Sequence, residues 1–171
     1  MTVNTYLRLV SPGVYYSPSP ICEIGPCEIE TIKEAARSNG LGRARICTHA
    51  SADDAVHEML IAFCGQPYVR AHRHHGKAES FHIIEGRMTI VLFNDDGIVD
   101  KKIRLGPLGT GRHLYYRLSS PIFHTVLAED DFIVFHEVTN GPFKKGDAEE
   151  ASWAPALDDI PAQEKFLAQL S

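Results

Sequence analysis

Short runs in which apolar and polar residues alternate fill the middle of the chain and predict a series of β-strands. The runs are rich in Val, Ile and Phe, and turn-forming residues separate them, with Asp96-Gly97 as a strong hairpin signal. The predicted strands are Arg43–His49, His57–Phe63, Tyr68–His74, Ser80–Glu85, Met88–Phe93, Val99–Leu105, Leu114–Leu118, His124–Ala128 and Phe132–Val138. Many short strands at regular spacing are typical of an all-β sandwich or barrel.

One segment before the strands has the spacing of a helix. Ile29, Ile32 and Ala36 predict a helix over residues 28–38, which Asn39-Gly40 ends. The preceding residues are rich in Pro and Ser and predict an extended arm. We therefore expect three parts: an arm with the N-terminal helix over 1–40, a barrel over 41–140, and a C-terminal loop with a short helix packed on the barrel over 141–171.

Composition and charge narrow the class of protein. The 171 residues carry a net charge of −5, which argues against a nucleic-acid-binding surface because such a surface is basic. The N-terminus has no basic flank followed by a long apolar run, so we predict no secretory signal and expect a cytoplasmic protein. No apolar run is long enough to span a bilayer, so we expect no membrane partner.

One stretch carries the residue types of a metal site. His72 and His74 are two positions apart, so on a strand both side chains leave the same face. Glu79 follows a turn, and it can start the neighbouring antiparallel strand and point its carboxylate back at the imidazoles. Gly86 then closes a tight turn. Much later, Pro121-Ile-Phe-His124 places a third histidine at the start of another predicted strand.

Three neutral imidazoles and one carboxylate suit a divalent first-row metal ion. Four protein ligands leave two octahedral positions for water or a ligand, and open positions are the mark of a catalytic rather than a structural metal site. We predict one divalent transition metal per chain, and iron, zinc, manganese and nickel all stay open.

The pattern H-x-H-x4-E-x6-G followed by P-x-x-H resembles the two signature motifs of the cupin superfamily. Gly65 sits one residue earlier than is usual in the first motif, and the second motif lacks its usual Gly and Asn. The stretches around Arg43–His49, His57–Ala62, Tyr68–His74, Lys77–Gly86, Gly141–Phe143 and Ala151–Pro155 are similar to cupin metalloproteins of the WbuC type.

The resemblance implies a cupin fold, that is, a double-stranded β-helix or jelly-roll barrel, and a metal held by His72, His74, Glu79 and His124. Proteins of the WbuC type occur among bacterial genes of surface-polysaccharide biosynthesis. Cupins often pair through an N-terminal arm, so we expect a homodimer. The resemblance implies no particular reaction.

Alternation along the strands predicts which residues surround the metal. Arg70 shares the parity of the two motif histidines, so we expect it to point into the barrel. A buried arginine needs a partner, which is either an internal carboxylate such as Glu85 or an anionic ligand. Phe81 and Ile83 share the face of Glu79 and predict an apolar wall. Arg70 and Phe81 are thus the predicted substrate-binding residues.

A second set of arginines alternates along the first predicted strand. Arg43, Arg45, Cys47 and His49 share one face there. This face is either a basic rim of the barrel or the solvated side of an edge strand, and we favour the second interpretation.

These features favour a metal-dependent enzyme that acts on a small anionic or sugar-related metabolite. A dioxygenase and a Lewis-acid isomerase or lyase both fit the ligand set. The alternative is a non-catalytic cupin that binds a metal or a metabolite. The sequence assigns no catalytic residue beyond the metal ligands.

Overall fold

The computed structural model describes residues 7–144 and 146–170. The first six residues of the predicted arm, and residues 145 and 171 of the predicted C-terminal part, lie outside the described residues. The elements are β1 (Arg8–Ser11), β2 (Val14–Tyr16), α1 (Pro26–Ser38), β3 (Arg43–Cys47), β4 (Val56–Cys64), β5 (His72–His74), β6 (Glu79–Glu85), β7 (Met88–Phe93), β8 (Val99–Leu105), β9 (Tyr115–Leu118), β10 (Phe123–Ala128), β11 (Phe132–Asn140), β12 (Ala148–Glu150) and α2 (Ile160–Leu170).

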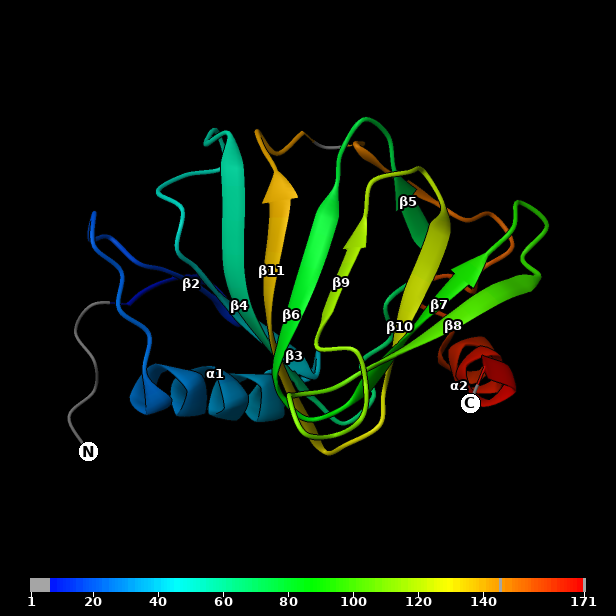
Figure 1. Ribbon diagram of the computed structural model, residues 1–171, viewed down its shortest axis with the longest axis horizontal. Coiled ribbons are helices and arrows are strands. Elements are labelled where there is room, and N and C mark those ends of the chain that lie inside the picture. The colour runs from blue at the N-terminus through cyan, green and yellow to red at the C-terminus, as the bar shows by residue number, and fades with distance from the viewer. Residues whose placement is uncertain (1–6, 145, 171) are drawn as a thin grey trace.

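The strands form two sheets that face each other (Figure 1). One has seven strands in the order β1-β2-β3-β4-β11-β6-β9, and the other has five in the order β12-β5-β10-β7-β8. Neighbouring strands are antiparallel except β2 and β3, which are parallel. The two sheets are not joined into a closed barrel, so the architecture is an open jelly roll. Strands β1, β2 and β12 extend the sheets with residues from both predicted flanking parts.

Most strand boundaries lie within a residue or two of the predicted ones, and β7 and β8 match them at both ends. The main difference lies at residues 68–71, which belong to no strand although the sequence predicts one from Tyr68. The carbonyl of Val69 accepts a hydrogen bond from the Thr125 hydroxyl, and the carbonyl of Ala71 accepts one from the Ala151 amide. These bonds occupy the backbone without a strand ladder, so regular alternation begins only at His72.

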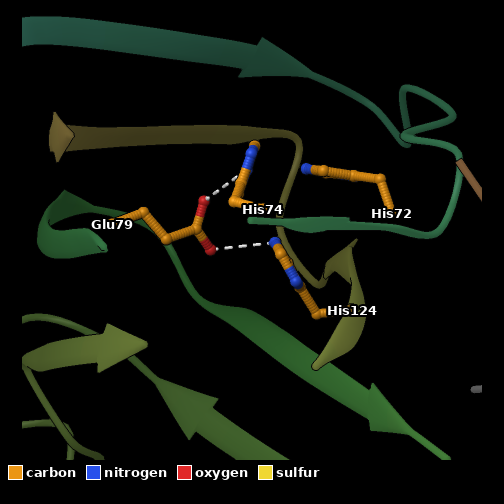
Figure 2. A group of neighbouring side chains, drawn as sticks. All are labelled: His72, His74, Glu79 and His124. Carbon is orange, nitrogen blue, oxygen red and sulfur yellow. Dashed lines mark ion pairs between the residues drawn. The ribbon is translucent and has the colours of Figure 1, made fainter. Parts of the chain in front are cut away.

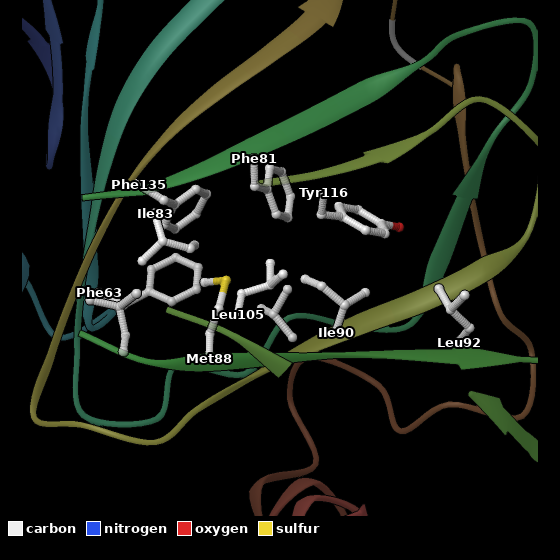
Figure 3. Packing of buried hydrophobic residues seen from close by; sticks show 11 residues of the cluster. Phe63, Phe81, Ile83, Met88, Ile90, Leu92, Leu105, Tyr116 and Phe135 are labelled. Carbon is white, nitrogen blue, oxygen red and sulfur yellow. The ribbon is translucent and has the colours of Figure 1, made fainter. Parts of the chain in front are cut away.

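The largest hydrophobic cluster fills the space between the two sheets (Figure 3). It combines residues of both inner faces: Phe63, Phe81, Ile83, Met88, Ile90, Leu92, Leu105, Tyr116, Val126, Ile133 and Phe135. Burial of so many large side chains is the main source of stability for a domain of this kind. The cluster also fixes the distance between the sheets, and the proposed metal ligands lie beside it.

Each helix covers the outer face of one sheet (Figure 1). Helix α1 packs Ile32 and Ala36 against the seven-stranded sheet, and its first turn is capped by the Glu28 carboxylate, which accepts from the Gly25 amide at 2.8 Å. Helix α2 contributes Phe166 and Leu170 to a cluster on the five-stranded sheet. Neither helix of the described residues has both the length and the apolar character that crossing a membrane requires.

Candidate metal centre

Four side chains from three strands converge at one end of the interior (Figure 2). His72 and His74 lie on β5, His124 lies on the adjacent β10, and Glu79 begins β6. Their potential ligand atoms all lie within 4.8 Å of one another. The structure therefore brings together all four residues that the sequence nominates as metal ligands.

The two sheets contribute to this cluster from opposite sides. His124 is the direct cross-strand neighbour of His72 in the five-stranded sheet. Glu79 belongs to the seven-stranded sheet, where β6 pairs with β11 and β9. The expectation that Glu79 starts a strand beside the histidines is thus wrong: the turn over 75–78 crosses between the sheets, and the carboxylate faces the imidazoles across the interior.

Backbone hydrogen bonds fix the orientation of two of the rings. The Nδ1 atoms of His72 and His124 each lie 2.9 Å from a carbonyl oxygen two residues earlier, that of Arg70 and Ile122 respectively. A carbonyl can only accept, so each Nδ1 carries the proton, and in the neutral ring Nε2 then presents a lone pair. Such a bond from the second ring nitrogen is the usual way in which proteins orient a metal-binding histidine.

The carboxylate of Glu79 completes the cluster. Its Oε1 lies 2.9 Å from Nε2 of His124, and its Oε2 lies 3.4 Å from Nε2 of His74. Oε1 and the His124 Nε2 are both fully buried, and neither has a hydrogen-bond partner of good geometry among the described residues. A buried lone pair facing a carboxylate oxygen is repulsive unless a proton or a metal ion lies between them.

The pKa values show how the cluster behaves without a metal ion. Burial, with the nearby charge of His124, lowers the pKa of His72 to about 4, so this ring stays neutral at pH 7. Burial opposes the charged form of His124, but contact with Glu79 outweighs it and the pKa of His124 is raised. Burial alone would raise the pKa of Glu79, yet its contacts with His124 and His74 outweigh burial and the pKa is lowered. The carboxylate is therefore ionised and the site is ready to hold a cation.

The donor set fits a divalent transition metal. Neutral imidazoles and one ionised carboxylate are the ligands that zinc, iron, manganese and nickel accept, and the geometry does not distinguish among these metals. A bound cation would satisfy the two orphaned atoms of the Glu79–His124 contact at once. The metal assignment is a prediction that this arrangement supports.

A cavity of about 590 Å³ opens beside the four residues. Its size lies within the range of small-molecule sites. Apolar side chains form much of its wall, among them Ile61, Phe63, Val69, Phe81 and Phe135. Phe81 thus lies where the sequence places it, on the wall next to Glu79, and its contact with a substrate stays a prediction.

Glu137 is a cavity residue that the sequence analysis does not identify. It lies on β11 directly opposite Phe81 of β6. Burial, with the charge of Glu79, raises the pKa of Glu137 to about 8 against the opposing effect of Arg45. Glu137 lies two positions after Phe135, so the sequence could have placed both on one face of a strand. Only the register of β11 shows that this face lines the cavity.

Arg70 does not line the cavity, so the expectation that it points into the barrel is wrong. Its guanidinium pairs with the Glu150 carboxylate of β12 and donates to the carbonyl of Ala151. Glu85, the other partner considered for it, instead pairs with Lys33 of α1 at 2.7 Å. The parity argument fails because residues 68–71 are not part of a strand, and Arg70 is a structural residue that holds β12.

Arg43 and Arg45 line the cavity instead. Strand β3, which carries them, lies between β2 and β4 and is not an edge of the sheet. Both side chains are exposed at the opening, while Cys47 of the same face is buried. The favoured interpretation, a solvated edge strand, is therefore wrong, and the alternative of a basic rim describes these residues.

Comparison with known proteins gives a match to one protein family. Residues 26–105, less than half of the chain, match a family described as a domain of unknown function (DUF6016). A search of curated proteins finds no match.

Solved structures resemble the fold at low sequence identity. A protein from Shewanella oneidensis has a TM-score of 0.50 at 17% identity, over 71% of this chain and 72% of that one. A cupin superfamily protein from Desulfitobacterium hafniense has a TM-score of 0.45 at 17% identity, over 57% and 76%. A structure described as a sugar phosphate isomerase from a cupin superfamily, from Silicibacter pomeroyi, has a TM-score of 0.46 at 18% identity, over 61% and 64%. With its two facing sheets and its N-terminal helix, the chain has the all-β jelly-roll fold that the sequence predicts.

Proposed function

We propose that this protein is a mononuclear metal-dependent enzyme that acts on a small anionic or sugar-related metabolite. One divalent transition metal is held by His72, His74, Glu79 and His124, and the substrate occupies the cavity beside them. The observation that carries the proposal is the contact between Oε1 of Glu79 and Nε2 of His124, two buried atoms 2.9 Å apart with no hydrogen-bond partner of good geometry among the described residues.

Each protein group has a defined part in this proposal. The metal supplies Lewis-acid polarisation of a bound oxygen atom or, if it is iron, redox chemistry. The carbonyls of Arg70 and Ile122 hold the two imidazoles in the orientation that points Nε2 at the metal. Phe81 excludes water from the substrate side of Glu79. Glu137 places a carboxyl group with a raised pKa in the same cavity, where it is able to exchange a proton with the substrate near neutral pH.

Metal content tests the proposal directly. The Glu79→Gln and His72→Ala proteins, purified without added metal and analysed by plasma mass spectrometry, should contain far less metal than the wild type. His82→Ala is the matched control, because His82 lies on the exposed face of the same strand as Glu79. Circular dichroism should show that all three variants keep the fold. If the Glu79→Gln protein retains one ion per chain with unchanged affinity, the assignment of this ligand is wrong.

Oxygen uptake separates the two enzyme classes. The iron-loaded protein is screened against small keto acids, dicarboxylates and sugar phosphates in an oxygen electrode. Uptake that depends on substrate and is lost in the His72→Ala protein indicates a dioxygenase. Turnover without uptake indicates Lewis-acid chemistry, and binding without turnover indicates the non-catalytic alternative.

Three finer expectations stay predictions. They are kinship with the WbuC type, a role in polysaccharide biosynthesis, and a homodimer, the last of which sedimentation velocity measures directly.

A further inference from the structure

We propose that Arg43 and Arg45 form a subsite that binds the phosphate group of the ligand that occupies the cavity. This inference rests on the proposed function in one respect: the rest of the ligand extends from the arginines toward the four metal-site residues.

Both arginines lie on the inner face of β3 at the opening of the cavity. They are two residues apart, so their side chains leave the same face of the strand. Arg43 is the cross-strand neighbour of Phe63 and Arg45 that of Ile61, and both of these β4 side chains also line the cavity. The register of the sheet therefore places two guanidinium groups side by side on the cavity wall.

The close approach of the β1–β2 turn holds this part of the wall in place. The Gly13 carbonyl accepts a hydrogen bond from the Arg45 amide at 2.7 Å, and Val14 pairs with Arg45 in the parallel ladder. Gly13 has φ +73, and a Cβ there would lie 2.5 Å from the side-chain nitrogen of Asn39 and 3.0 Å from the Arg43 carbonyl. Only glycine fits this approach, which brings the turn to the edge of the arginine pair.

Within the part of the chain that the structure describes, the two positive charges have no carboxylate partner. Among residues 7–144 and 146–170, neither Arg43 nor Arg45 forms an ion pair, whereas Arg37, Arg70, Arg73, Arg87 and Arg112 all do. The pKa of Arg43 is lowered, because partial burial disfavours its charged form and the positive charge of Arg45 repels it. Of the described residues, the other charged side chains that line the cavity are those of Glu137 and the metal-site cluster, and Glu137 lies beyond β4 on β11.

The chemistry of this pair favours phosphate over carboxylate. Two adjacent guanidinium groups match the charge of a phosphate dianion, and their planar donor forks fit its terminal oxygens. A single carboxylate would neutralise one of the two charges and leave the other. Between the arginines and the metal-site residues the wall is mainly apolar, with Phe135 and Phe81 among its members. The expected ligand is therefore a phosphate monoester whose uncharged part lies against this wall.

Titration with inorganic phosphate tests the subsite in the 171-residue chain. Nuclear magnetic resonance follows the Nε–Hε groups of the arginines and the amides of Gly13 and Val14, in zinc-loaded and in metal-free protein. Phosphate should shift the signals of Arg43, Arg45 and the turn. The Arg43→Gln and Arg45→Gln substitutions should each weaken phosphate binding by about tenfold, the value of one charge-assisted hydrogen-bonding group.

The control is Arg117→Gln, which removes the same charge from an exposed position on β9 that faces away from the interior. It should leave phosphate affinity unchanged. Shifts confined to the second basic hollow, which Lys101, Lys102 and Arg104 line, would overturn the proposal. So would affinity that survives both arginine substitutions, or acetate binding as tight as phosphate. If the protein holds none of zinc, iron, manganese and nickel but phosphate still binds at the arginines, the metal proposal fails and this subsite stands.

Discussion

The partly buried imidazole of His72 should make the metal-free protein sensitive to acid in a measurable way. Its pKa is lowered from 6.5 to about 4, first by burial and then by the charge of His124. Because the pKa is lower in the folded chain than in the unfolded one, protonation favours unfolding. The contribution that neutral His72 makes to the free energy of unfolding is fully present above about pH 6.5, decreases as the pH falls, and is gone below about pH 4.

The size of the effect follows from the two pKa values. Each pH unit between them corresponds to about 1.4 kcal/mol, so protonation of His72 costs roughly 3 kcal/mol of unfolding free energy. Glu79, whose pKa is lowered, acts in the same direction at still lower pH. The loss attributable to His72 therefore has to be isolated by comparison with a variant that cannot titrate at this position.

Urea denaturation with a chelator present provides the measurement. The free energy of unfolding is determined at pH 7 and at pH 4 for the wild type, for His72→Asn and for the exposed control His82→Asn. The wild type and the control should lose about 3 kcal/mol more than His72→Asn over this interval. Equal losses in all three proteins would show that His72 is not held neutral by burial, and the account of the cluster would have to be abandoned.

Three further predictions concern the surroundings of the site. Glu137→Gln should raise the melting temperature of the metal-free protein at pH 8. The raised pKa of Glu137 means that the folded wild-type chain loses stability as the pH rises from about 4.5 toward 8, and glutamine does not titrate. Equal melting temperatures of the two proteins would contradict this. Gly86→Ala should lower the free energy of unfolding by more than about 2 kcal/mol, because φ is +75 and a Cβ would lie 2.1 Å from a carbonyl oxygen of β11. Gly76→Ala, at φ +68 with open space around it, should lower it by about 1 kcal/mol in the same denaturation assay. Glu150→Gln should cost at most about 1 kcal/mol because its pair with Arg70 is half exposed, and it should leave metal content and phosphate affinity unchanged.

The sequence by itself determined the features that depend on neighbours along the chain. Strands β7 and β8 match their predicted bounds because turn-forming residues, Gly86 before β7 and Asp96-Gly97 between the two strands, interrupt the apolar runs in the sequence. The same parity predicted that His72 and His74 share a face. The H-x-H-x4-E-x6-G spacing and the later His124 named all four residues that the fold then brings together.

Only the tertiary structure decided which strands pair and which sheet each one joins. Glu79 faces the histidines from the opposite sheet, and His124 pairs directly with His72, although neither fact is encoded by spacing. For the same reason the sequence predicted Arg70 in the cavity, whereas the structure places Arg43 and Arg45 there. A strand satisfies its hydrogen bonds with partners distant in the chain, and those partners fix both its register and the direction of its side chains.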